Sequence, residues 1–205
     1  PHDVDVPLVV VDTSSLIDGR IVRVCEAGFL SAALVIPRFV LVEVQGIADS
    51  QDPHKQARGR RGLEVLNQLR KIKRLDLRVH ESEAKPGEVE AKLVFLAQSM
   101  KARLLTTDYN LAKMAEFQGV QWLNLHALAK ALRPQLVMGE ALEVELVKAG
   151  KEEGQAVGYL EDGSMVVVAD GRAYIGQTVH VEIVSILPSS GGKMVFARVQ
   201  SERRL

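Results

Sequence analysis

Short β-branched runs alternate with helical patterns over the first two thirds of this 205-residue chain, and this alternation constrains its fold more than any other feature. Residues 7–12 are an apolar run that predicts a fully buried strand, and residues 33–36 and 103–107 repeat the pattern. Helical stretches, such as residues 37–49 and 108–117, lie between the runs. Because strands joined by helices pair in parallel, we expect an α/β fold with a central parallel sheet flanked by helices.

Two further patterns fill the middle of this region. Residues 50–62 are polar and basic, and a helix is predicted to follow them, because apolar residues return at near-helical spacing from Leu63. Apolar and polar residues then alternate over residues 75–79, which predicts a strand. Pro86 and Gly87 are expected to open another helix.

The pattern changes after Gly139, where short alternating strands replace helices. Residues 142–149 alternate between apolar and acidic side chains, and Asp162-Gly163 between two apolar runs is a strong hairpin signal. Several short strands at this spacing predict a small all-β barrel. Two domains are therefore expected, over residues 1–135 and 139–205.

Overall charge and cysteine content exclude several classes of protein. Lys+Arg and Asp+Glu both number 26, so any argument for a nucleic-acid partner must come from local clusters. The single cysteine, Cys25, excludes an intrachain disulfide and a cysteine-based zinc site, and its helical, apolar context predicts a buried residue. No apolar run approaches the roughly 18 residues that span a bilayer, and no signal peptide is visible.

Four carboxylates stand in apolar or helical surroundings: Asp12, Glu43, Glu90 and Asp108. An unpaired buried charge is costly, so carboxylates in such places call for a cation. Asp12 and Asp108 both follow predicted strands, and parallel sheets bind ligands at the carboxyl ends of their strands. If the fold gathers all four, their oxygens suit Mg²⁺ or Mn²⁺, the metals that commonly cut phosphodiesters. Taken singly, Asp12 and Asp108 are equally well explained as helix caps, and Glu43 as part of a solvated face.

Several motifs resemble PIN-domain proteins, and the last third extends the resemblance to the bacterial branch in which a TRAM domain follows. They are Asp-Thr-Ser-Ser-Leu-Ile-Asp-Gly-Arg-Ile at 12–21, Ile-Pro-Arg-Phe-Val-Leu-Val-Glu-Val-Gln at 36–45, Ala-Arg-Gly-Arg-Arg-Gly-Leu at 57–63, Leu-Thr-Thr-Asp-Tyr-Asn-Leu at 105–111, residues 154–168 and Met-Val-Phe-Ala-Arg at 194–198. Each motif is short, but their order covers nearly the whole chain. The resemblance implies a PIN-like domain followed by a TRAM-like, OB-like barrel.

The resemblance also implies a ribonuclease that uses one or two Mg²⁺ or Mn²⁺ ions to hydrolyse RNA, leaving 5′-phosphate and 3′-hydroxyl ends. The acidic positions of the family fall on Asp12, Glu43 and Asp108, which would bind metal and act in catalysis. One further acidic position, which is commonly Asp in the family, falls on Glu90. This departure bears on whether one or two metals bind. Ser14 and Asn110 match supporting polar positions.

Basic and aromatic residues predict where RNA, single-stranded or structured, would bind. The sharpest basic cluster consists of Lys55, Arg58, Arg60 and Arg61. It predicts a phosphate-binding site that Arg20 joins, and the start of a solvated helix explains the cluster equally well. On the barrel, the predicted surface is centred on Tyr159 and Arg198, with Arg172, Tyr174, Lys193 and Phe196 beside them. Strand aromatics are more often core, and residues 136–205 hold 7 basic against 10 acidic side chains, which supports RNA binding there poorly.

The resemblance further implies a homodimer, since PIN domains often pair, and a membrane anchor before Pro1, as in many members of the branch. We expect no membrane contact from this fragment itself and a cytoplasmic location, tethered to the inner face of the membrane. One alternative is an RNA- or protein-binding module with little nuclease activity. Another is a phosphotransferase or phosphatase with Asp12 as nucleophile. The sequence argues against it, because Ser14 occupies the position where such an enzyme needs a second aspartate.

Overall fold

The computed structural model describes residues 6–200 apart from 86, 134 and 191, and it divides into two compact units, Pro1–Leu132 and Arg133–Leu205. The boundary expected from the sequence, at residues 136–138, lies a few residues past this division. No helix in the described ranges combines the length and apolarity needed to cross a membrane. Each unit has its own hydrophobic core.

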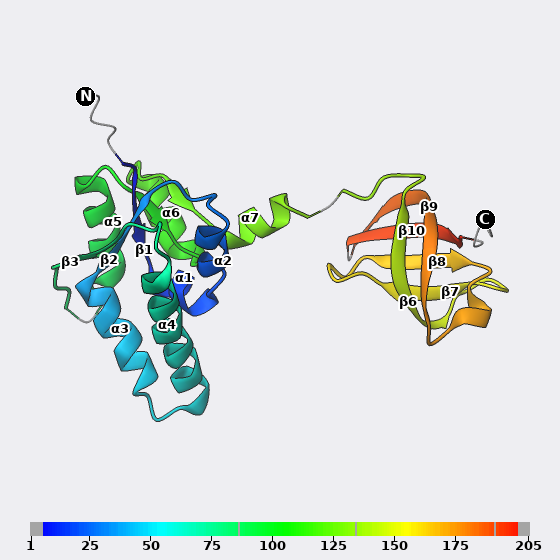
Figure 1. Ribbon diagram of the computed structural model, residues 1–205, viewed down its shortest axis with the longest axis horizontal. Helices are drawn as coiled ribbons and strands as arrows, with labels where there is room; N and C mark the ends of the chain where they lie inside the picture. Colours follow the sequence, from blue (N-terminus) through cyan, green and yellow to red (C-terminus); the bar gives the residue numbers. More distant parts are fainter. Residues whose placement is uncertain (1–5, 86, 134, 191, 201–205) are drawn as a thin grey trace. The chain divides into compact units, whose positions relative to one another are not determined.

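A five-stranded parallel sheet in the order β3-β2-β1-β4-β5 forms the centre of the first unit (Figure 1). Its strands are β1 (Leu8–Val11), β2 (Ala33–Pro37), β3 (Leu77–His80), β4 (Arg103–Leu105) and β5 (Trp122–Leu123). The predicted α/β class is confirmed, and the apolar runs are buried strands for the reason expected, since helices cover them. The chain adds β2 and β3 on one side of β1 and β4 and β5 on the other, so the strand order reverses between β1 and β4. In open α/β sheets such a reversal marks the crevice where ligands bind.

The first unit has seven helices in the described chain: α1 (Thr13–Asp18), α2 (Ile21–Glu26), α3 (Arg38–Ala48), α4 (Pro53–Lys71), α5 (Val89–Ser99), α6 (Tyr109–Phe117) and α7 (Leu125–Ala131). Their apolar faces pack on the strands, and Leu16, Leu93 and Leu111 are among the fully buried side chains. Cys25 is buried as predicted, and this burial raises the pKa of its thiol to about 11. The thiol is therefore protonated at neutral pH and a poor nucleophile.

Helix α4 begins ten residues before the predicted start, and the prediction that a helix only follows residues 50–62 was wrong. The Asp52 carboxylate accepts a hydrogen bond from the His54 amide at 2.8 Å, and Pro53 occupies the first turn, where a missing amide costs nothing. Gly59 lies inside the helix, where a Cβ atom would stand 2.1 Å from the Ala48 nitrogen of α3. Glycine disfavours helix, but Gly59 allows the backbones of α3 and α4 to come into contact. Figure 1 shows these two helices side by side.

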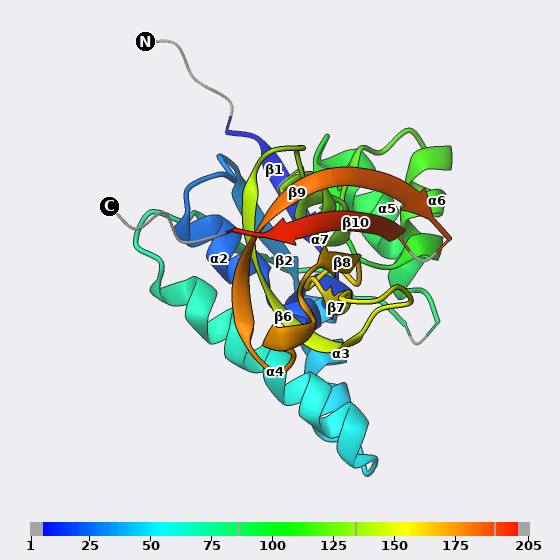
Figure 2. The ribbon, with the colours of Figure 1, turned by 90° about the vertical axis from the view of Figure 1, so that its right-hand side faces the viewer.

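The second unit is a closed five-stranded barrel in the order β10-β8-β7-β6-β9, and the predicted all-β barrel is confirmed. It is built from β6 (Ala141–Ala149), β7 (Ala156–Tyr159), β8 (Met165–Ala169), the 3₁₀ turn η1 (Arg172–Tyr174), β9 (Thr178–Ser189) and β10 (Gly192–Val199). Figure 2 shows β9 and β10 as long, curved strands that wrap around the barrel. Gly158 permits close strand contact, because a Cβ atom there would lie 2.3 Å from the Glu145 carbonyl oxygen.

Candidate active site

Asp12 and Asp108 lie at the ends of the two strands between which the strand order reverses. Asp12 follows β1 directly, and its amide donates a hydrogen bond of 3.0 Å to the Leu105 carbonyl at the end of β4. Asp108 is the N-cap of helix α6 and follows shortly after Leu105, the last residue of β4. Both carboxylates therefore stand at the carboxyl edge of the sheet, beside the point where the strand order reverses. That they act together as one site stays a prediction.

The Asp12 carboxylate is held by hydroxyl and amide donors. Its side chain, which is 7% exposed, accepts hydrogen bonds from the Ser14 hydroxyl at 2.5 Å, the Thr106 hydroxyl at 2.9 Å and the Ser14 amide at 3.3 Å. No basic side chain of the described residues forms an ion pair with it. Burial raises the pKa of Asp12, and the hydrogen bonds from Ser14 and Thr106 oppose this rise. Asp12 is thus a buried carboxylate that no basic side chain of the described residues neutralises.

Asp108 serves as the N-cap of α6, so the capping role considered from the sequence is real. Its Oδ1 accepts hydrogen bonds from the amides of Asn110 at 2.7 Å and Leu111 at 3.1 Å. The Asp108 amide in turn donates to the Thr106 hydroxyl at 3.0 Å. Both side-chain bonds fall on Oδ1, just as all three hydrogen bonds to the Asp12 side chain fall on Oδ2. The second oxygen of each carboxylate accepts none of these hydrogen bonds and is the candidate ligand for a metal ion.

Glu43 is linked to the segment after β1 through the hydroxyl of Thr13. It lies on α3, and its Oε2 accepts a hydrogen bond from the Thr13 hydroxyl. Thr13 is buried and directly follows Asp12. The Glu43 carboxylate is therefore held beside the residue that follows the buried aspartate, although Asp12 and Glu43 are 31 positions apart in sequence.

Glu90 is the predicted acid that the structure does not connect to the others. It lies in the first turn of α5 and is exposed, and no hydrogen bond or ion pair of the described residues involves its carboxylate. Within the described residues, no three Asp, Glu, His or Cys side chains are grouped closely enough to hold a metal ion. The oxygen donors suit a hard divalent cation, but a complete ligand set is not assembled in advance.

Of the two predicted supporting residues, Ser14 has clear contacts. Its hydroxyl donates to Asp12 and accepts a hydrogen bond of 3.0 Å from the Thr107 amide, so it connects β1 to the segment after β4. Asn110 contributes its backbone amide to the Asp108 cap, and its side chain is exposed. The sequence reading missed Thr13 and Thr106, whose hydroxyls contact the carboxylates. Their signal is the placement of threonine beside each strand-end aspartate, in Asp12-Thr13 and Thr106-Thr107-Asp108.

The basic residues predicted to bind phosphate fall into two groups. Arg20 is paired in a bidentate manner with Asp18, through contacts of 2.7 Å each, and Arg61 donates to the Asp18 carbonyl at 2.8 Å. Lys55, Arg58 and Arg60 are exposed on α4, and no side-chain partner of theirs is found in the described part of the chain. The structure brings Arg20 and Arg61 together at Asp18 but leaves the other three cations available to a ligand.

On the barrel, the two predicted RNA-binding residues have different surroundings. Tyr159 is 45% exposed, and the Lys148 ammonium lies 5.3 Å from the centre of its ring, a cation–π contact at the surface. Arg198 forms an ion pair with Glu182 at 3.1 Å, so its charge is already partly compensated. Tyr159 is thus an accessible aromatic, whereas Arg198 would have to leave a carboxylate to bind phosphate.

Comparison with known proteins identifies relatives of the same two-domain organisation. A protein of Bacillus subtilis, named an uncharacterized PIN and TRAM-domain containing protein, is 45% identical over 199 residues, which are 96% of this chain and 54% of that protein. A protein of Thermus thermophilus with the same designation is 49% identical over 189 residues, covering 92% of this chain and 56% of its own length. The chain therefore spans about half the length of these curated relatives. No family model matches the chain.

Among solved structures, a domain of a functionally unknown protein from Methanocaldococcus jannaschii matches with a TM-score of 0.52 at 25% identity. The match covers 64% of this chain and 97% of the other. The parallel sheet with flanking helices and the closed five-stranded barrel agree with a PIN domain and a TRAM or OB-like domain. The chain belongs to the family of PIN and TRAM-domain containing proteins.

Proposed function

We propose that this chain is a divalent-metal-dependent endoribonuclease whose active site is the crevice between the ends of β1 and β4. The observation that carries the proposal is Asp12, a buried carboxylate with no cationic partner among the described residues, at the reversal of the strand order. A buried charge without a partner is costly, and a bound cation would remove that cost. PIN domains are generally nucleases, which agrees with this assignment.

Mg²⁺ or Mn²⁺ would be held by Asp12 and Asp108, through the carboxylate oxygens outside the hydroxyl network, with Glu43 completing the set directly or through water. When bound, such an ion lowers the pKa of its water and stabilises the charge that develops on a phosphodiester. The side chains of this protein would position the ion: Ser14 and Thr106 orient Asp12, and the amides of α6 orient Asp108.

RNA would be held by the exposed cations of α4 and by the barrel. Lys55 and Arg58 offer charges that no described acidic group compensates, and phosphate binding by such residues also offsets repulsion between the carboxylates and the RNA backbone. Tyr159 offers a ring on which a base can stack. The substrate class is RNA because the domains of this family suggest RNA binding.

The second candidate function is an RNA-binding module without nuclease activity. Two observations favour it: no three acidic side chains in the described ranges are grouped for a metal, and Asp108 already has a capping role. The two candidates differ in what the loss of Asp12 does, since a binding module needs neither a metal nor that carboxylate.

The decisive experiment incubates the purified chain with end-labelled single-stranded RNA in Mn²⁺, Mg²⁺ or EDTA, beside Asp12→Asn and the surface control Asp49→Asn. We expect cleavage with metal, none in EDTA, and a loss of at least about a hundredfold in Asp12→Asn alone, the scale expected when one catalytic electrostatic group is removed. Fragments should carry 5′-phosphates. RNA binding without cleavage, unchanged in EDTA and in Asp12→Asn, would establish the binding module instead.

A further inference from the structure

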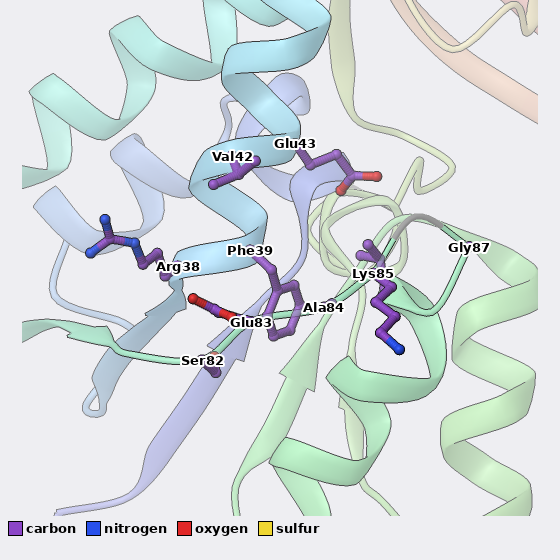
Figure 3. A pocket seen from close by; sticks show the side chains of 10 residues that line it. Arg38, Phe39, Val42, Glu43, Ser82, Glu83, Ala84, Lys85 and Gly87 are labelled. Carbon is purple, nitrogen blue, oxygen red and sulfur yellow. The ribbon is translucent and has the colours of Figure 1, made fainter.

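A pocket of about 500 Å³ opens between helix α3 and the segment that leads into α5 (Figure 3). One wall is formed by residues of the first two turns of α3, and the other by residues 82–85, 87 and 89. Figure 3 shows Phe39 in the middle of the lining and Glu43 at one end. The volume falls within the range of roughly 300–1,000 Å³ that is typical of ligand pockets.

The pocket adjoins the proposed active site through Glu43. This side chain lines the pocket and at the same time accepts the hydrogen bond of Thr13, the residue after Asp12. A ligand in the pocket would therefore touch the same carboxylate that supports the acidic crevice.

The chemistry of the lining suits a flat molecule with apolar faces and polar edges. Phe39, Val42, Ala84 and Val89 supply apolar surface, and the Val42 side chain is 64% exposed although it stands on a pocket wall. Glu43, Glu83 and Lys85 supply hydrogen-bond acceptors and donors around that surface. Lys85 is exposed and has no ion-pair partner among the described residues, so its charge is free for a phosphate.

We propose that this pocket binds one unpaired nucleobase of single-stranded RNA, next to the phosphodiester that lies at Asp12 and Asp108. The inference rests on the proposed function for its substrate class. A base in the pocket places its sugar and phosphate at the Glu43 end, which is the end shared with the acidic crevice. Duplex RNA cannot present a base in this way, so the site selects single-stranded segments.

The test measures RNA binding in the Asp12→Asn background, where cleavage does not interfere. The probe is a fluorescein-labelled eight-nucleotide single-stranded RNA, together with a set of the same RNA carrying one abasic ribose at each position in turn. Val42→Trp fills the mouth of the pocket, and Gln45→Trp places the same ring on an exposed position of α3 outside the pocket lining. Ala84→Leu narrows the pocket from the opposite wall and guards against a local effect of tryptophan on α3.

We expect Val42→Trp and Ala84→Leu to weaken binding of the intact RNA about tenfold, as for loss of one stacked base, and Gln45→Trp to have no effect. One abasic position should weaken binding by a similar factor, and the two pocket variants should then add little to that loss. Equal binding by Val42→Trp and Gln45→Trp, or equal losses on intact and abasic RNA, would overturn the nucleobase pocket. Cleavage by the unmodified chain in Mn²⁺ is scored separately. A chain that cleaves without base-dependent binding keeps the nuclease and loses the pocket, and the reverse result keeps the pocket and loses the nuclease.

Discussion

Thr106 and Asp12 are joined by a hydrogen bond of 2.9 Å between side chains at the ends of two neighbouring strands. The same threonine oxygen accepts a hydrogen bond of 3.0 Å from the Asp108 amide. One buried hydroxyl therefore couples the two aspartates that carry the proposed chemistry. A conformational change at either aspartate would be transmitted to the other through this hydroxyl.

Replacing Thr106 with valine keeps the shape of the side chain and removes the hydroxyl. Asp12 then loses a donor while it remains buried, so we expect the free energy of unfolding to fall by about 1–3 kcal/mol and the pKa of Asp12 to rise further. Thr106→Ser keeps the hydroxyl and is the matched control. Urea unfolding of the three proteins measures the loss, and equal stability of Thr106→Val and Thr106→Ser would refute the coupling.

Asp12 should make stability depend on pH in the absence of metal. Burial raises the pKa of this carboxyl in the folded state above its ordinary value of 3.8, so the folded protein holds the proton more tightly than the unfolded chain does. The corresponding stability is complete below the ordinary pKa and is lost as the pH rises through the folded one. We therefore expect Asp12→Asn to gain stability relative to the unmodified chain as the pH rises above about 3.8.

Urea unfolding at several pH values in EDTA measures this difference. Mn²⁺ should restore stability to the unmodified chain and leave the stability of Asp12→Asn unchanged, because only the carboxylate is expected to bind the cation. A difference between the two proteins that stays constant with pH would show that Asp12 has the same pKa in both states.

Two glycines near the same helix contact should respond in opposite ways to alanine. At Gly59 a Cβ atom would stand 2.1 Å from the Ala48 nitrogen, so Gly59→Ala must push α3 and α4 apart and should cost about 1–3 kcal/mol or more. At Gly46 on α3, nothing lies within 4 Å of the added atom. Gly46→Ala should instead stabilise the protein by about 0.4–1 kcal/mol, because alanine favours the helix. Thermal unfolding of both variants checks the sign, which is the informative result.

The exposed cations at the start of α4 should contribute to RNA binding. The double variant Lys55→Ala and Arg58→Ala should weaken binding to all sequences alike and reduce the slope of log affinity against log salt by about 1–2. Arg70→Ala with Lys71→Ala removes the same charge from the other end of the same helix. Fluorescence anisotropy at several salt concentrations compares the two, and identical slopes would exclude this end of α4 from the RNA-binding surface.

Much of the fold followed from local patterns, because buried strands and helix starts leave strong signals. The run at 7–12 predicted a fully buried strand with an acid at its end, and the observed strand covers Leu8–Val11. The early start of α4 was missed, because its interior glycines and polar residues hide a helix whose stability comes from contact with α3 and from the Asp52 cap.

The candidate site was less predictable than the fold. The sequence placed Glu90 in helical, apolar surroundings, but a residue on such a helix can still face solvent, and Glu90 is exposed. The threonines beside the strand-end aspartates are visible in the sequence, but the partners of the Thr13 and Thr106 hydroxyls lie roughly 30 and 90 residues away, and periodicity does not reveal such contacts. Whether the four acids act in catalysis stays a prediction for the cleavage experiment.

The backbone contact at Gly59 has a consequence for how this protein can diverge. Helix α3 carries Glu43 and one wall of the pocket, and α4 carries the exposed cations. Because the main chains of the two helices meet at Gly59, their spacing does not depend on the length of any side chain there. Side chains on the pocket wall and on the cationic face of α4 can therefore change independently, while the spacing of the two helices stays constant.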